Sequence, residues 1–141
     1  MSKVLIISDN PTISDSMKAT FSNVGWASDS VNLPSVTQQG DYLVGQNTCV
    51  VLVIDKGFLA RFSKYVEDIA TMIRNCAICA PIYLVFEGDY DPTFASWLEY
   101  TKRLFKSITQ PQKIQQAIEE IVRLETRAVP RSAYCSPMDA F

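Results

Sequence analysis

The chain has 141 residues, of which 48% are hydrophobic and 20% charged, a composition typical of one globular domain. Thirteen basic and fifteen acidic residues give a formal net charge of −2, which offers no support for nucleic-acid binding. The absence of histidine excludes a Ser–His or Cys–His nucleophile, an imidazole zinc site and a histidine phosphodonor. No apolar run is long enough to span a membrane and the N-terminus lacks a signal-peptide pattern, so we expect a cytoplasmic protein.

The first half of the chain alternates short apolar runs with segments of helical character. Val4 to Ile7 is continuously apolar, as in a strand buried on both faces. Asn10 as N-cap and Pro11 as first helical residue start a helix, which Gly25 closes. The pattern then predicts, in order, a weak strand over 27–32, a short helix after Pro34 and a strong strand over Val50–Ile54.

The second half continues this alternation. Apolar residues recur at helical spacing from Leu59 to Cys76, and Ile82–Phe86 predicts a fourth strand. The pattern then predicts a helix that begins around Phe94 and Trp97, a short strand at Leu104–Phe105, and a last helix with an apolar face of Ile114, Ala117, Ile118, Ile121 and Val122.

This order of elements predicts a single α/β domain of the (βα)5 type. Right-handed crossovers would give a doubly wound, five-stranded parallel sheet of strand order 2-1-3-4-5, the flavodoxin-like arrangement, with helices on both faces. We place the domain at residues 1–125. Residues 126–141 contain two prolines and no periodic pattern, which indicates a flexible C-terminal tail or linker.

Polar residues follow three of the predicted strands at the edge where such sheets bind ligands. Ser8 and Asp9 follow the first strand, Asp55 follows the third, and Lys106 follows the fifth. Two carboxylates and an ammonium suit Mg²⁺ and a phosphoryl group carried on a carboxylate. For any one of these residues alone, ordinary solvation of a strand end is an equally good explanation.

Five segments resemble those of response-regulator receiver domains, the CheY-like family. They are VLIISDNP (4–11), VGW (24–26), VVLVID (50–55), APIYLV (80–85) and LFKSIT (104–109). The resemblance covers about residues 3–124. It implies that Asp55 is the phosphoacceptor, that Asp9, Asp55 and Gly57 hold Mg²⁺, and that Lys106 contacts the phosphoryl group.

The chain departs from the family pattern at positions that matter for the phosphorylation switch. Ser8 replaces the first of two acidic residues, which predicts weak Mg²⁺ binding at most. Phe86 stands where the family has a Ser or Thr, and Arg103 where it has a Tyr or Phe. We therefore interpret the chain as an atypical or pseudo-receiver that acts through protein–protein contacts, with phosphorylation absent or secondary.

The predicted fourth helix is unusually aromatic, which indicates an interaction face. Trp97, Tyr100 and, on the rim, Arg103 would form it together with the fifth strand and the last helix, with a place for Trp97 in the core as the alternative. Its partner would be a signalling kinase, an output or scaffold protein, or a second copy of the chain.

Two other patterns have ordinary explanations that we favour. The motif from Cys76 to Cys79 falls at a predicted helix C-terminus, which indicates structural thiols rather than redox or zinc chemistry. Glu87, Asp89 and Asp91 indicate a solvated acidic loop, with a supplement to the metal site as the alternative.

Two alternative functions stay open. The first is a working two-component receiver that a histidine kinase phosphorylates on Asp55. The second is a flavodoxin-like enzyme, although residues 8–16 lack the glycine of a phosphate cradle and carry two acidic side chains. We expect a protein that is not an enzyme.

Overall fold

The computed structural model describes residues 2–32, 47–58, 66–76, 80–88, 92–106, 108 and 110–127. Several sequence-based predictions lie outside these residues: the short helix after Pro34, the start of the helix from Leu59, the second cysteine of the Cys76–Cys79 motif, Asp89 and Asp91 of the acidic loop, and the tail from 128 onward.

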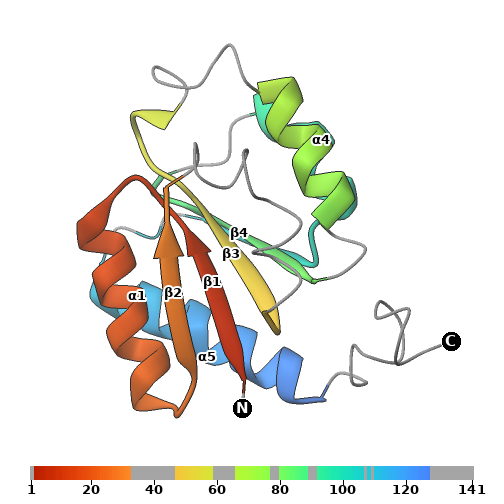
Figure 1. Cartoon of the computed structure of the whole chain (residues 1–141). Helices are drawn as coiled ribbons and strands as arrows, with labels where there is room; N and C mark the ends of the chain where they lie inside the picture. Colours follow the sequence, from red (N-terminus) through yellow and green to blue (C-terminus); the bar gives the residue numbers. More distant parts are fainter. Residues whose placement is uncertain are drawn as a thin grey trace, which may run out of the picture.

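Five parallel strands form one sheet in the order β2-β1-β3-β4-β5, as the sequence predicts (Figure 1). The strands are β1 (Lys3–Ile7), β2 (Ala27–Val31), β3 (Cys49–Ile54), β4 (Ile82–Phe86) and β5 (Arg103–Phe105). Every residue of β3 and β4 is buried, which explains their continuously apolar sequences. The weakly patterned β2 lies at the edge of the sheet.

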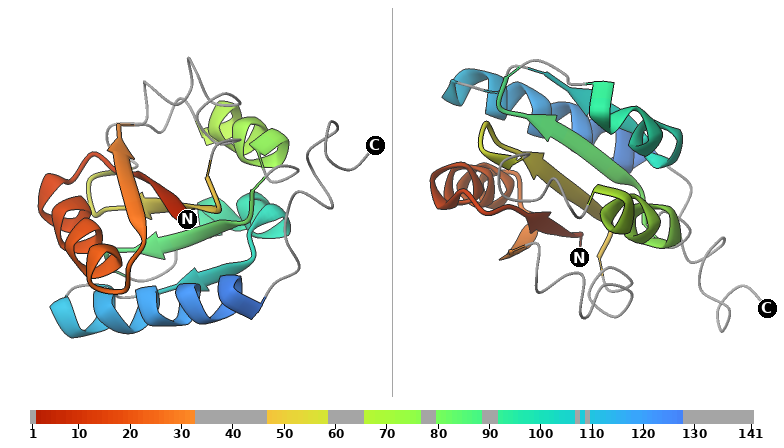
Figure 2. Two further views of the ribbon diagram at one scale, coloured as in Figure 1. Left: turned by 60° about the horizontal axis from the view of Figure 1, so that its bottom comes forward. Right: turned by 90° about the horizontal axis from the view of Figure 1, so that it is seen from above.

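Helices cover both faces of the sheet (Figure 2). They are α1 (Pro11–Asn23), α4 (Val66–Cys76), the 3₁₀ helix η2 (Pro92–Tyr100) and α5 (Pro111–Arg127). On one face α1 and α5 pack through Met17, Phe21 and Ile118, and on the other α4 and η2 pack through Ile69 and Trp97. None of the described helices combines the length and the hydropathy that a membrane span requires.

The start of α1 follows the capping pattern of the sequence. The Oδ1 atom of Asn10 accepts a hydrogen bond from the Ile13 N–H at 3.2 Å, and Pro11 is the first helical residue. Gly25 follows the helix with a φ of 83°, a left-handed conformation that favours glycine.

Two elements differ from the sequence-based predictions. The fourth helix is a 3₁₀ helix, in which residues three apart share a face, and this places Phe94 and Trp97 together in the core. The last helix continues through Thr126 to Arg127, two residues beyond the expected domain boundary.

A polar network inside the core fastens α5 to the sheet. The side chain of Glu125 is only 2% exposed, and its Oε2 atom accepts hydrogen bonds from the Tyr83 hydroxyl at 2.5 Å and the Lys102 ammonium at 2.9 Å. Burial, reinforced by the hydrogen bond to Glu125, raises the pKa of the Tyr83 phenol far above its ordinary value. Tyr83 therefore stays a neutral donor, and the two donors offset the cost of burying the carboxylate.

We predict that Tyr83→Phe lowers the free energy of unfolding by about 1–2 kcal/mol, because the buried carboxylate loses one of its donors. Urea denaturation followed by circular dichroism measures this change. Tyr100→Phe is the matched control, since Tyr100 is 37% exposed. Equal stability of the two variants would show that the network does not fasten α5.

Candidate functional site

The turn after β1 is organised by its own side chains. The Ser8 hydroxyl donates to the Asn10 carbonyl at 3.2 Å and accepts from the Asn10 N–H at 3.0 Å. Asp9, between them, is exposed to solvent. Ser8 thus stabilises the turn that presents Asp9 and starts α1.

A hollow of about 500 Å³ lies beside this turn, at the carboxyl ends of β1 and β2 and the start of α1. Its lining includes Asp9, Asp15, Ser30 and Asn32. The acidic side chains oppose the attraction of the α1 N-terminus for anions. The hollow therefore does not suit a flavin phosphate.

The loop after β3 is anchored in the core. Asp55 is partly exposed, and its carbonyl accepts a hydrogen bond from the Phe58 N–H at 3.1 Å across a turn that contains Gly57. Phe58 is 3% exposed and packs edge-on against Phe94 and Trp97, with ring centroids 5.8 Å and 6.0 Å away. These contacts fix the position of the loop that carries Asp55.

Glu87 contacts this loop directly, which the sequence did not predict. Its backbone N–H donates to the Ile54 carbonyl at 2.9 Å, and its carboxylate Oε1 accepts from the Lys56 N–H at 3.1 Å. Glu87 thus bonds to the residues on both sides of Asp55. The proximity of Glu87 to the site could be predicted from the parallel sheet, but the direction of its side chain could not.

Phe86 fills the end of β4. It is 2% exposed and packs against Phe94 at a centroid distance of 5.5 Å. A side chain held in this way cannot form a hydrogen bond with a group on Asp55, nor can it move toward one without leaving a cavity.

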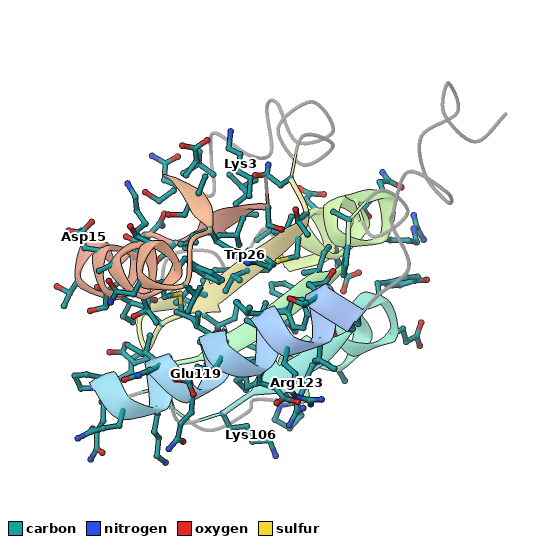
Figure 3. The ribbon with its side chains drawn as sticks, turned by 90° about the horizontal axis from the view of Figure 1, so that it is seen from below. Lys3, Asp15, Trp26, Lys106, Glu119 and Arg123 are labelled. Atoms are coloured by element: carbon teal, nitrogen blue, oxygen red, sulfur yellow. The ribbon has the colours of Figure 1, made fainter. Side chains whose placement is uncertain are left out.

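Lys106 lies in a groove between β5 and α5. The groove has a volume of about 360 Å³, and its lining includes Arg103, Phe105, Lys106, Lys113 and Glu120. Figure 3 shows Lys106 and Arg123 on the same outer side of α5, across the molecule from Asp15 of α1. The predicted contact of Lys106 with a phosphoryl group on Asp55 stays a prediction.

Two guanidinium groups share one carboxylate beside this groove. Arg103 donates to Glu120 Oε1 at 2.5 Å, and Arg123 also binds Glu120. The hydrogen bond from Arg123 lowers the pKa of the Glu120 carboxyl. Arg103 additionally lies over the ring of Phe105 at 5.3 Å, so its position is well defined.

Trp97 does not belong to an interaction surface, contrary to the sequence-based prediction. It is fully buried and packs against Phe94 at a centroid distance of 4.6 Å, because the 3₁₀ helix turns both residues toward the sheet. Tyr100 and Arg103, the other two predicted members, are exposed.

Oxygen donors for Mg²⁺ are present but few. Ser8 replaces a carboxylate, and its hydroxyl is engaged in the turn after β1. Within the described ranges, no group of three or more acidic, cysteine or histidine side chains could hold a metal ion. The Mg²⁺ site expected at Asp9, Asp55 and the Gly57 carbonyl stays a prediction.

The chain matches no family model, and no curated protein resembles it closely enough to count as a relative. Solved structures do match. The response regulator from Hahella chejuensis has a TM-score of 0.65 at 14% identity, covering 91% of this chain and 97% of that one. The signal receiver domain of a two-component histidine kinase from Clostridium thermocellum has a TM-score of 0.60 at 15% identity, covering 86% and 98%.

A CheY-like receiver domain from Methanospirillum hungatei is also similar, with a TM-score of 0.59 at 12% identity and coverage of 90% and 98%. The structural neighbours are thus receiver domains of response regulators, and the chain has their fold. At these identities the likeness establishes the fold alone.

We predict that Ser8→Asp strengthens Mg²⁺ binding about tenfold, because it adds a carboxylate beside Asp9. Titration with Mg²⁺, followed by the amide NMR shifts of Asp9 and Gly57, measures the affinity. Ser22→Asp, at the far end of α1, is the control for added charge. If both variants bind Mg²⁺ equally, residue 8 is not part of a metal site.

Proposed function

We propose that this chain is an atypical receiver-like signalling module, whose output is a contact with another protein and for which phosphorylation is absent or secondary. The observation that carries the proposal is the burial of Phe86, which is 2% exposed at the end of β4. Coupling a group on Asp55 to a surface requires a side chain that responds to that group. Phe86 offers neither a hydroxyl nor freedom to move.

The residue at position 8 supports the same proposal. With Ser8 in place of an acidic residue, Mg²⁺ would be held by Asp9, Asp55 and the Gly57 carbonyl, and only weakly. When bound, the ion would neutralise charge on a phosphoryl group. We propose no catalytic turnover, no nucleic-acid binding by this domain and a cytoplasmic location.

A working receiver is the second candidate, favoured by the position of Asp55. The residue is partly exposed and follows the strand adjacent to β1, on the same edge as Asp9. Attack by a carboxylate oxygen of Asp55 on acetyl phosphate would form an oxygen–phosphorus bond. The bond from phosphorus to acetate would break, and acetate would leave with the electron pair.

The face formed by the end of η2, β5 and α5 is the proposed docking surface. Tyr100, Arg103, Lys106 and Lys113 lie on it and are exposed. The groove also holds Glu120, which pairs with Arg103, so that Lys106 and Lys113 give it a basic balance. Tyrosine and arginine often supply much of the affinity of interfaces. The surface therefore fits a protein partner with acidic side chains.

A second copy of the chain fits this surface less well. A twofold dimer would bring the same patch of both copies together. Lys106 and Lys113 of both copies would then be brought into one interface, and like charges oppose that approach. We therefore favour a different protein over a homodimer.

We predict that acetyl phosphate with Mg²⁺ produces no stoichiometric, phosphate-sized mass gain on the wild-type chain. Intact mass spectrometry measures the gain, and Asp55→Asn identifies any modification of Asp55. A stoichiometric gain that disappears in Asp55→Asn would favour the working receiver instead.

We also predict that the protein partner is retained by Asp55→Asn but bound about tenfold more weakly by Tyr100→Ala with Arg103→Glu. Quantitative affinity capture with each variant as bait compares the two. Arg74→Glu, an exposed change on α4, is the control for reversed charge. Loss of binding in Asp55→Asn alone would make the contact dependent on Asp55 and contradict the proposal.

A further inference from the structure

At the end of the hydrogen-bond ladder between β3 and β4, the side chain of Glu87 takes the place of a backbone acceptor. The two strands are parallel, with Ile54 opposite Phe86, so Asp55 is the next residue opposite Glu87. In a parallel ladder the Glu87 N–H bonds to the Ile54 carbonyl, and the Lys56 N–H would next bond to the Glu87 carbonyl. Instead, the Lys56 N–H donates to the Glu87 side chain, Oε1, at 3.1 Å.

This contact places the carboxylate of Glu87 against the backbone that directly follows Asp55. Glu87 is bonded through its backbone to the residue before Asp55 and through its side chain to the residue after it. The Lys56 N–H is the first backbone donor that follows Asp55. An oxyanion attached to Asp55 needs nearby N–H donors for its negative oxygens. Glu87 already occupies this one.

We propose that Glu87 inhibits the phosphorylation of Asp55, a role that we call the guard. Its carboxylate competes with a phosphoryl oxygen for the Lys56 N–H and repels the negative charge of an approaching phosphodonor. The ligand class that it excludes is the small tetrahedral anion, of which a phosphoryl group and its mimic beryllofluoride are examples. The proposal rests on the function proposed above, in which Asp55 is phosphorylated slowly or not at all.

The anchored loop makes this guard effective. Phe58, three residues after Asp55, is fixed in the core by Phe94 and Trp97. The loop is therefore held in place while Glu87 accepts from the Lys56 N–H. Removing the side chain of Glu87 frees this donor without disturbing the core, because Glu87 itself is only partly buried.

The test compares the rate at which Asp55 is labelled by acetyl phosphate with Mg²⁺ in the wild type, Glu87→Ala and Glu87→Gln. We expect Glu87→Ala to be labelled about tenfold faster, because both the charge and the competing acceptor are gone. Glu87→Gln keeps an acceptor oxygen but loses the charge, so its rate should lie between the other two. Glu67→Ala, an exposed change on α4, is the control, and Asp55→Asn identifies the labelled residue.

A second measurement does not depend on labelling. The Lys56 amide proton should move upfield in the NMR spectrum of Glu87→Ala, since it loses a hydrogen bond to a carboxylate, and stay in place in Glu67→Ala. An unchanged Lys56 resonance would overturn the proposal, as would a labelling rate of Glu87→Ala equal to that of the wild type, including no labelling of either.

The outcomes for the guard and for the proposed function can be told apart. Rapid labelling of the wild type, with still faster labelling of Glu87→Ala, would preserve the guard and overturn the proposed function. Slow labelling of both would preserve the proposed function and overturn the guard.

Discussion

The parallel pairing of β3 with β4 is the constraint on which the candidate site depends. Both strands are buried along their whole length, so a shift in register would move apolar side chains from one packed face to the other. The register that results places Ile54 opposite Phe86. Asp55 and Glu87 must then leave the sheet side by side, which brings Glu87 within reach of the loop after Asp55.

Aromatic packing then immobilises the surroundings of Asp55. Phe58, Phe86, Phe94 and Trp97 join the loop after β3, the end of β4 and η2 in one buried cluster. Each aromatic pair contributes about 0.5–1.5 kcal/mol beyond its buried area. A site built in this way is rigid. In the proposed function, the docking surface at the end of η2, β5 and α5 (the β5–α5 surface) is therefore available whatever the state of Asp55.

The sequence predicted the fold well because buried parallel strands and amphipathic helices leave strong periodic patterns. Sequence-based prediction failed where the same side chain suits both the core and the surface. Trp97 is of a residue type that is common in interfaces, but the 3₁₀ helix points its side chain into the core. Glu125 did leave a signal, since it continues the spacing of Ile114, Ile118 and Ile121 on the apolar face of α5. The direction of the Glu87 side chain left no signal in the sequence, because only the folded sheet brings residues 56 and 87 together.

The central claim is that the β5–α5 surface does not respond to the occupancy of Asp55. The amide NMR spectrum of Glu87→Ala, in which the Lys56 N–H is free to bind the ligand, tests it most directly with and without beryllofluoride and Mg²⁺. The resonances of Lys56 and Gly57 report that the ligand is bound. The account predicts that the resonances of Arg103 to Phe105 and of α5 keep their positions. A saturable shift of these resonances that is absent in Asp55→Asn would show a working switch and contradict the account.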